Sequence, residues 1–300
     1  MPHDQTYLET LLEDFEAHLR SRGRSVHTLR AYRTDLRQFA AWFVDHTGEP
    51  FTLEEVTEYD VQDWRDHLNA KMKPATVNRK LAALSTLYGW ARGKRQIERD
   101  PTRYVDGVKQ QETAPKALSR RDLNRILRQA RKSGNKRDAA LLELLAATGL
   151  RTSEIAGLTV GDLELNDRSG WVTVRATEGK GRKKRRVPVY ARARRLLREY
   201  LEERDGSALP ADAPVFVSRK GGAITPYAVW YTVKKYAGLA DVEDVSPHSF
   251  RHTVGTRLVR DPEVDLVTAA AYLGHSRLDT TMQYSRPSER DLEAAADKLT

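Results

Sequence analysis

The sequence predicts a mostly α-helical protein with one small β-sheet, confined to an α+β second half. Apolar side chains recur every three or four residues through the first hundred residues, which is the spacing of amphipathic helices. Periodicity then disappears over residues 100–116. Further helical segments follow, interrupted at residues 171–189 by a short alternation typical of a hairpin.

The loss of periodicity indicates a domain boundary. Residues 100–116 are polar and contain the helix breakers Pro101, Gly107 and Pro115. We predict domains at 1–108 and 118–300 with a linker at 109–117, and 300 residues are enough for two cores of ordinary size.

Four helices are expected in the first domain. The first covers residues 5–22, ends at Gly23 and is followed by three more, with Pro74 near the start of the last. Their apolar faces are Leu29, Tyr32, Leu36, Phe39 and Phe43; Val61, Trp64 and Leu68; and Val77, Leu81, Leu84 and Leu87. The polar faces of the second and fourth helices either contact DNA or face water, through Arg30, Arg33, Asn78, Arg79 and Lys80.

The second domain begins with two helices. Ser119 and Asp122 form a capping pair for a helix at 120–131, and 141–147 follows as a buried helix. We expect a hairpin at 171–189, joined by a short strand at 215–217.

Three further helices are predicted from their first residues. The first two open at Thr225-Pro226 and Ser246-Pro247, because proline is favoured in the first helical turn. The third runs from Asp265 to Tyr272 and is closed by Gly274.

Composition limits the possible functions. The chain has no cysteine, which excludes disulfides, thiolate metal sites and a cysteine nucleophile. Its longest apolar stretch, 141–150, is too short to span a membrane, and no secretory signal is visible at the N-terminus. We therefore expect a cytoplasmic protein that makes no membrane contact.

Positive charge is concentrated in one segment. The net charge is +9, from 51 Lys and Arg against 42 Asp and Glu, and residues 182–186 are five consecutive cations. Such a run is a solvated face, a localisation signal or a phosphate-binding surface. Its position beside Lys180 favours phosphate contact.

Six side chains of the second half stand in distinctive local contexts, in the order Arg151, Lys180, His248, Arg251, His275 and Tyr284. The contexts are Ala-Thr-Gly-Leu-Arg-Thr-Ser-Glu, Gly-Lys-Gly, His-Ser-Phe-Arg-His and Leu-Gly-His, with the tyrosine nine residues after the last histidine. This ordered series resembles the tyrosine recombinases of the Xer type, and the resemblance covers nearly the whole chain.

The proposed chemistry is reversible cleavage of a DNA strand. It needs a nucleophile, for which Tyr284 is the candidate, and groups that neutralise the phosphate. Arg151 and Arg251 suit this second task because a guanidinium donates paired hydrogen bonds to phosphate oxygens. The alternatives are a core tyrosine and a surface ion pair of Arg151 with Glu154; the resemblance implies instead that Glu154 orients Arg151.

The remaining candidates handle protons. Lys180, in the hairpin turn, is expected to protonate the leaving 5′ oxygen, and His248 to accept the proton of Tyr284. His275 is expected to hydrogen-bond the phosphate, whereas a solvated turn lysine and helix-end histidine are the alternatives. We interpret His252 as structural and pointing elsewhere.

Local signals also bear on Tyr284 and the C-terminus. Ser276 and Asp279 form a capping pair for a short helix that would carry Tyr284. Residues 288–299 are expected to form a helix with an apolar stripe, which the resemblance implies docks on a neighbouring protomer.

The resemblance implies a SAM-like helical DNA clamp followed by a catalytic domain. It further implies a 3′-phosphotyrosyl intermediate, a Holliday junction and four protomers on double-stranded DNA with an inverted-repeat site. No cofactor or metal is expected, and the nucleoid is the expected location. Dimer resolution in chromosome partition, transposon resolution and integration or excision all remain open, as does a need for a second recombinase or an accessory activator.

Two departures and several alternatives accompany this interpretation. Val254-Gly255 replaces a bulkier pair, and Ser285-Arg286-Pro287 follows the tyrosine where threonine and histidine are common. A type IB topoisomerase and a non-catalytic DNA-binding protein on the same fold are the alternative functions. A phosphate-binding P-loop sequence is lacking, and the acidic residues Asp241, Glu243 and Asp244 are interpreted as a solvated loop rather than a metal nuclease site.

Overall fold

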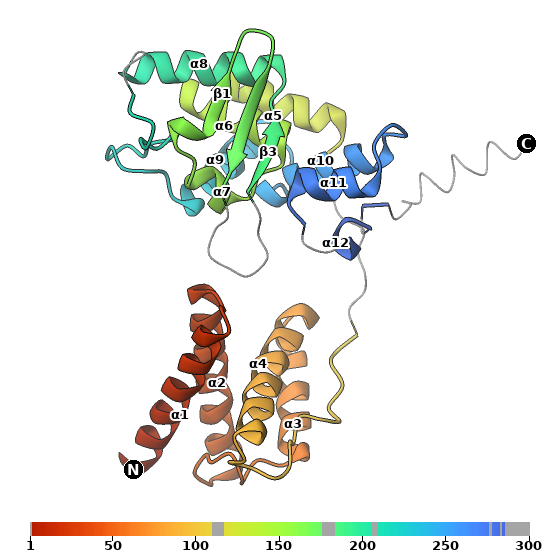
Figure 1. Cartoon of the computed structure of the whole chain (residues 1–300). Helices are drawn as coiled ribbons and strands as arrows, with labels where there is room; N and C mark the ends of the chain where they lie inside the picture. The colour runs from red at the N-terminus through yellow and green to blue at the C-terminus, as the bar shows by residue number, and fades with distance from the viewer. Residues whose placement is uncertain are drawn as a thin grey trace, which may run out of the picture. The chain divides into compact units, whose positions relative to one another are not determined.

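A computed structural model describes residues 2–109, 117–175, 184–205, 209–275, 278–282 and 284–285. These residues divide into two compact units, 2–109 and 117–285, each with its own hydrophobic core. The predicted fold class, mostly helical with a small sheet, is confirmed (Figure 1). No helix of the described chain is long and apolar enough to cross a membrane.

The first unit consists of the four predicted helices, α1 (Pro2–Ser21), α2 (Val26–Thr47), α3 (Glu58–Asn69) and α4 (Pro74–Gly93). Ser25 caps α2 by accepting the Thr28 N–H, and Thr57 and Asp60 form a capping box at α3. Aromatic rings fill the core, with the Phe39 and Trp64 ring centroids 4.8 Å apart.

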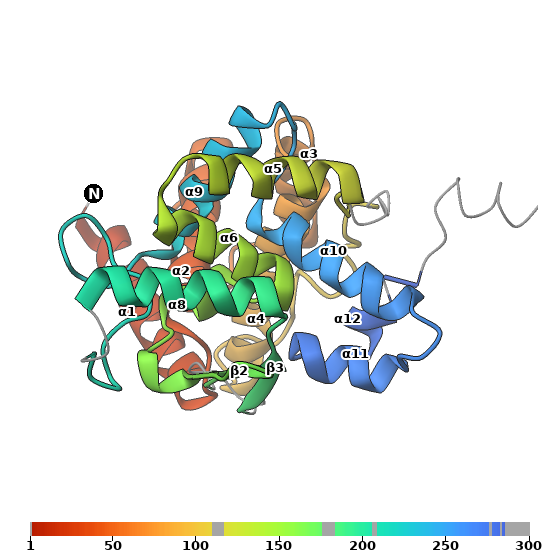
Figure 2. The same ribbon diagram turned by 90° about the horizontal axis from the view of Figure 1, so that it is seen from above.

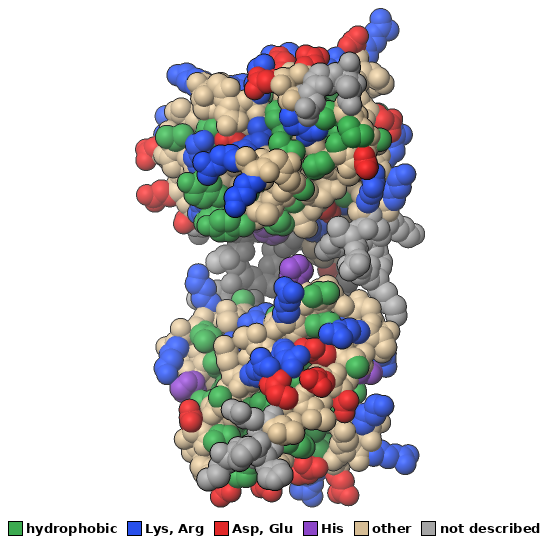
Figure 3. All heavy atoms as spheres, turned by 90° about the vertical axis from the view of Figure 1, so that its left-hand side faces the viewer, with side chains coloured by type: hydrophobic (Ala, Val, Ile, Leu, Met, Phe, Trp, Pro, Cys, Tyr) green, Lys and Arg blue, Asp and Glu red, His purple; other side chains and the backbone are tan. Residues whose placement is uncertain are grey.

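Most of the basic and polar side chains expected on α2 and α4 have partners inside the unit. Arg33 donates to Glu9 at 2.7 Å, and Lys80 donates to buried Asp35 at 2.9 Å. Arg79 also pairs with Asp35, whereas Arg30 is exposed. Basic and acidic side chains lie intermingled on the face of this unit that Figure 3 displays. The prediction that these side chains face water or DNA is therefore wrong for Lys80, which is buried, whereas Arg79 keeps 45% of its side chain exposed.

The beginning of the non-periodic stretch packs on the first unit and is not an exposed linker there. Pro101 and Thr102 are buried, and Asn78 bridges to Val108 by two hydrogen bonds, at 2.8 and 2.7 Å. The polar composition predicted exposure, but a polar side chain, the amide of Asn78, provides the hydrogen bonds that the Val108 backbone needs when it packs on the unit.

The second unit surrounds a buried helix. Its helices are α5 (Arg120–Lys132), α6 (Lys136–Thr148), α7 (Thr152–Ala156), α8 (Ala191–Asp205), α9 (Pro226–Leu239), α10 (Pro247–Arg260), α11 (Leu266–Leu273) and α12 (Asp279–Met282). Every residue of α6 from Asp138 to Thr148 is buried, and α5, α8, α9 and α10 contact it (Figure 2). Helix α8 was not predicted, because its apolar positions are embedded in a run of arginines.

The sheet has three antiparallel strands in the order β1 (Leu163–Leu165), β2 (Gly170–Val174) and β3 (Arg185–Pro188). Val172 of the central strand pairs with Leu163 and with Val187. The hairpin prediction is confirmed, but the prediction that residues 215–217 join it is wrong. Val217 makes only an isolated bridge to Ala223. The strand that joins the hairpin is instead β1, whose three residues are too few to show an alternating pattern in the sequence.

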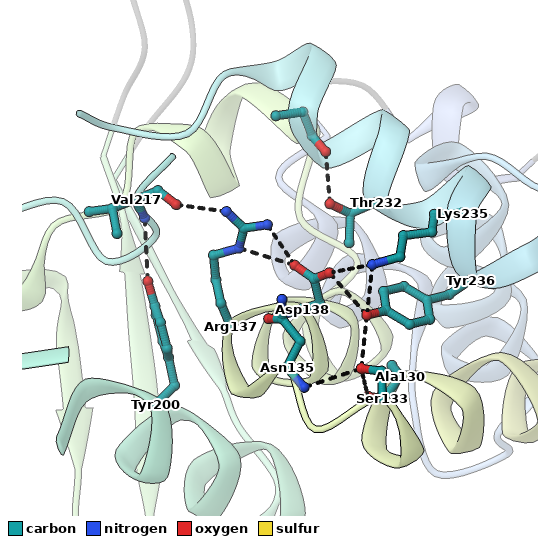
Figure 4. A network of polar contacts seen from close by, with 11 residues as sticks. Ala130, Ser133, Asn135, Arg137, Asp138, Tyr200, Val217, Thr232, Lys235 and Tyr236 are labelled. Carbon is teal, nitrogen blue, oxygen red and sulfur yellow. Dashed lines mark hydrogen bonds and ion pairs between the residues drawn. The ribbon is translucent and has the colours of Figure 1, made fainter. Parts of the chain in front are cut away.

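A buried polar network fixes the start of α6. The Asp138 carboxylate accepts hydrogen bonds from Arg137 at 2.8 Å and from the Tyr236 hydroxyl at 3.0 Å (Figure 4). Lys235 reaches the same carboxylate, and Ser133 bonds the Tyr236 hydroxyl. Because this network ties the α5–α6 turn to α9, it holds rigid the helix whose other end leads into Arg151.

Candidate active site

Arg151 lies at a sharp corner between α6 and α7. Helix α6 ends at Gly149, whose φ of +61° is the left-handed conformation that suits glycine, and Arg151 is the N-cap residue of α7. Buried Glu154 accepts both the Arg151 backbone N–H, at 2.9 Å, and its guanidinium, at 3.0 Å. The guanidinium is therefore held at one edge, and the Arg151 side chain stays 27% exposed.

A second arginine shares Glu154, and the sequence did not single it out. Arg185 donates to both carboxylate oxygens, each at 3.0 Å. Burial alone would raise the pKa of Glu154, but the hydrogen bonds and charges of Arg185 and Arg151 lower it to about 2. Glu154 is thus a carboxylate at neutral pH and is shared between the two guanidinium groups.

Arg251 lies on α10 with its side chain buried. It donates to the carbonyl oxygen of Gly149 at 2.8 Å and to that of Leu273 at 2.6 Å. No carboxylate forms an ion pair with it among the described residues. Burial, followed by repulsion from Arg151, lowers the pKa of Arg251 to about 10. Arg251 therefore remains a cation at pH 7, beside a second cation.

Two histidines of α10 lie against each other. The rings of His248 and His252 meet edge to face, with centroids 4.5 Å apart. Burial and the positive charge of Arg251 and Arg151 lower the pKa of His248. For His252, burial and then the charges of His248 and Arg251 lower the pKa to about 4. Both rings are therefore neutral at pH 7 and can accept protons.

The structure contradicts the prediction that His252 points elsewhere. Its ring also contacts the ring of Tyr284, with centroids 5.3 Å apart, and its buried Nδ1 has no hydrogen-bond partner within the described chain. Residues four apart on a helix share a face, as do residues three apart, so His252 accompanies His248. That spacing was the signal that could have placed it in the site.

His275 follows Gly274, the left-handed C-cap residue of α11. Its Nδ1 lies 2.8 Å from the Thr281 hydroxyl, and its ring stacks on Tyr284 with centroids 6.0 Å apart. Burial and the surrounding arginines lower the pKa of His275 to about 4. The bond to Thr281 on α12 fixes the orientation of this neutral imidazole.

Tyr284 is buried, with only 3% of its surface exposed. It packs against Val254 and Leu273, and its ring covers Gly255 so closely that an added Cβ would lie 2.8 Å from Cε2 and Cζ. Helix α12 ends at Met282, so the prediction that this helix carries Tyr284 is wrong; the tyrosine lies in the turn that follows. Within the protomer, two histidines and the middle of α10 hold the phenol.

Five of the six predicted residues converge on this site, whereas Lys180 lies outside the described residues, as do Ser276 and 288–299. The five residues are Arg151, His248, Arg251, His275 and Tyr284. Arg185 and Arg151 share one buried carboxylate, Glu154, and Arg251 pairs with none in the described part of the chain, which leaves excess positive charge for an anion such as a phosphodiester. No group of three or more His, Asp or Glu side chains with metal-binding geometry occurs in the described part.

Comparison with known proteins identifies the fold and its relatives. The Phage integrase family model matches residues 116–290, and that of the Phage integrase, N-terminal SAM-like domain matches 12–95. Tyrosine recombinase XerC of Pelobacter propionicus is 33% identical, covering 95% of this chain and 93% of its own. Tyrosine recombinase XerD of Ralstonia nicotianae is also 33% identical, over 90% and 87%.

A solved structure shares the fold. The XerH site-specific recombinase bound to palindromic difH substrate, in a post-cleavage complex, superposes with a TM-score of 0.76 at 23% sequence identity. The match covers 92% of this chain and 80% of that one. Fold and relatives together define the class of protein, a site-specific recombinase. The chain belongs to the phage integrase family, in which it is an Xer-like tyrosine recombinase.

Proposed function

We propose that this protein cleaves and rejoins DNA through Tyr284. The observation that carries the proposal is the convergence of one buried phenol, three imidazoles and two incompletely neutralised guanidinium groups within one protomer. Such a set supplies a nucleophile, proton acceptors and phosphate ligands.

The cleavage step exchanges one phosphate ester bond for another. The Tyr284 oxygen forms a bond to phosphorus, and the bond from phosphorus to the 5′ oxygen breaks, leaving a 3′-phosphotyrosyl ester. The phenol proton passes to His248, and the leaving oxygen takes a proton from Lys180, which supplies a free 5′-hydroxyl. Because one phosphodiester is exchanged for another, the step needs no ATP.

The phosphate is held by the remaining residues. Arg151 and Arg251 are assigned to the two non-bridging oxygens, since each guanidinium carries five N–H donors, more than the bonds to Glu154 and to the backbone use. His275, held by Thr281, donates a further hydrogen bond from Nε2, which its neutral form can do when Nδ1 accepts from the hydroxyl.

Rejoining uses the 5′-hydroxyl of a partner duplex, which attacks the phosphotyrosyl ester and releases Tyr284. We propose two such rounds through a Holliday junction, carried out by four protomers on double-stranded DNA with an inverted-repeat site. The clamp would be domain 1–108 and the catalytic part 118–300, joined at 109–117, in a cytoplasmic, nucleoid-associated enzyme. Excision, integration and resolution of chromosome, plasmid or transposon junctions are the candidate roles, with or without a second recombinase or accessory activator.

Covalent capture of DNA tests the reaction and identifies the DNA recombination site in one experiment. Fragmented genomic DNA of the source organism is incubated with the protein, and DNA that stays attached in denaturant is sequenced. Wild-type protein should enrich one short inverted repeat, and Tyr284→Phe should enrich none, because phenylalanine has no oxygen to attack phosphorus. Absence of any wild-type adduct would refute the proposal.

The protein and its captured DNA site also distinguish the alternative functions. A recombinase joins two copies of the captured site, whereas a type IB topoisomerase would relax plasmids irrespective of that site. A non-catalytic DNA-binding protein would retain DNA only without denaturant.

A further inference from the structure

Arg185 belongs to the basic segment 182–186, and among the described residues of that segment it is the one that turns inward. It is the first residue of β3, and only 14% of its side chain is exposed. Its neighbour Arg186 is 50% exposed, pairs with Glu164 and lies over the Trp171 ring. Because successive strand residues point to opposite faces, the segment presents one arginine to the active site and the next to the far side of the sheet.

The first set of Arg185 contacts fixes Arg151. Glu154 Oε1 accepts from the guanidinium groups of both Arg185 and Arg151, and Oε2 accepts from Arg185 and from the Arg151 backbone N–H. The carboxylate is therefore held in one orientation by a bidentate partner on β3. Without that partner, Glu154 could rotate and carry the Arg151 guanidinium with it.

A second set of contacts fixes the segment before His275. Arg185 Nε donates to the carbonyl oxygen of Tyr272 at 3.2 Å. Its guanidinium also packs on Gly274, where an added Cβ would lie 2.5 Å from the nearest terminal nitrogen of Arg185. The same planar group thus touches the backbone that leads directly into His275 and the carboxylate that orients Arg151.

We propose that Arg185 is a positioning residue for strand cleavage, which sets Arg151 and His275 at the spacing that one phosphate requires. The inference rests on the proposed function. Arg185 itself donates through Nε and both terminal nitrogens to protein groups, so its role is to hold the two phosphate ligands and not to bind the phosphate. Lysine cannot replace it, because an ammonium group lacks the planar fork.

The test measures single-turnover cleavage of a nicked duplex carrying the captured site, with DNA saturating. Arg185→Gln and Arg185→Lys should each cleave on the order of 100-fold more slowly than wild type, the cost of about 1 Å of misplacement, with DNA affinity unchanged. Arg175→Gln is the matched control, since Arg175 also pairs with a buried carboxylate beside the hairpin, Asp162, but contacts neither Arg151 nor the Gly274 segment. It should cleave like wild type.

Two modified substrates distinguish positioning of the phosphate ligands from other roles. A methylphosphonate at the scissile position carries no charge and needs the arginines less, so the Arg185 defect should shrink. A 5′-bridging phosphorothiolate leaves without protonation, and it should not restore cleavage. Restoration by the thiolate would show that Arg185 acts through protonation of the leaving group and would overturn the proposal.

Further outcomes are equally decisive. Wild-type cleavage rates in Arg185→Lys and Arg185→Gln would overturn the inference while leaving the proposed function intact, because the wild-type adduct is measured in the same assay. Should Arg185→Gln unfold at the assay temperature, Arg185→Lys carries the test, since it keeps the charge beside Glu154. A loss of DNA affinity equal to the loss of rate would identify Arg185 as a DNA-binding residue instead, which also overturns it.

Discussion

Lys80 in the first unit and Arg251 in the second are both buried cations on helices that begin with proline, but their partners differ. Lys80 is 4% exposed and pairs with the Asp35 carboxylate at 2.9 Å, which also takes Arg79. Arg251 is 2% exposed and donates only to two backbone carbonyl oxygens among the described residues. One charge is neutralised within the fold, and the other is solvated by carbonyl dipoles and has no carboxylate counter-ion in the described part of the chain.

The different partners of Lys80 and Arg251 indicate that Lys80 serves the stability of the fold and that Arg251 serves the function. Pairing a buried cation with a carboxylate satisfies both groups, and breaking such a pair is costly. Burial of Arg251, followed by repulsion from Arg151, disfavours its charged form and lowers its pKa to about 10. A phosphate placed between the two guanidinium groups would remove that repulsion, so the second unit keeps unbalanced charge where the substrate is proposed to bind.

Substitution of these two residues should have the largest and most different effects. Arg251→Gln should reduce the cleavage rate on the order of 10²–10³-fold, as expected for loss of one preorganised phosphate donor. Lys80→Ala should instead cost about 3 kcal/mol of stability in the first unit, near the lower end of the range for a broken buried pair because Arg79 remains.

Hydrogen exchange of the full chain measures both effects by location. Lys80→Ala should lose protection in α2 and α4 only, while cleavage per bound duplex stays at the wild-type level. Equal loss of protection in α10 for Arg251→Gln, with cleavage unchanged, would mean that both cations serve the fold and that the comparison is wrong.

The sequence predicted those parts of the site that local spacing determines. Arg151 and Glu154 stand three apart at a helix start, and so do His248 and Arg251, and the structure places each pair on one side of its helix. Arg185 was not given a role in the site, because its neighbours in 182–186 are equally basic and the strand register is what turns it inward.

Tertiary contacts account for the remaining misses. Arg251 bonds carbonyl groups 102 and 22 residues away, which no local pattern encodes. Gly255 was noted only as a departure from a bulkier pattern, and its reason is the Tyr284 ring packed on its backbone. The predicted strand at 215–217 failed because apolar runs of that length do not distinguish a strand from a buried loop.

The neutral histidines of the second unit predict a pH response of its stability. His252 and His275 have folded pKa values of about 4, against an ordinary value near 6.5, because they are half-buried and lie near positive charge, from His248 and Arg251 at His252 and from Arg251, Arg151 and Arg185 at His275. The unfolded chain therefore binds more protons than the folded chain between pH 6.5 and 4. Stability from these rings is complete above pH 6.5 and is lost as the pH falls towards 4.

Urea unfolding at pH 7 and at pH 5 checks this response, with hydrogen exchange of the α10 and α11 amides as the probe of unfolding. The midpoint should fall at pH 5, and less so in His252→Gln. Glu154, whose pKa is about 2, loses its contribution only as the pH falls from about 4.5 towards 2, so it does not interfere at pH 5. An unchanged midpoint would mean that the pKa values of these imidazoles do not differ between the folded and the unfolded chain.

The smallest effects are expected at two helical glycines, Gly89 in α4 and Gly255 in α10. An added Cβ on Gly89 meets nothing within 4 Å, so Gly89→Ala should raise stability by up to about 1 kcal/mol through helix propensity alone. Gly255→Ala would bring its Cβ within 2.8 Å of the Tyr284 ring, which must then shift. That shift should offset the gain in propensity and lower the yield of covalent adduct while DNA binding is retained, since phenol placement controls attack on phosphorus. Melting temperature and adduct yield measured on both variants decide the matter: equal stabilisation of the two, with full adduct in Gly255→Ala, would show that the tyrosine does not rest on α10 when it reacts.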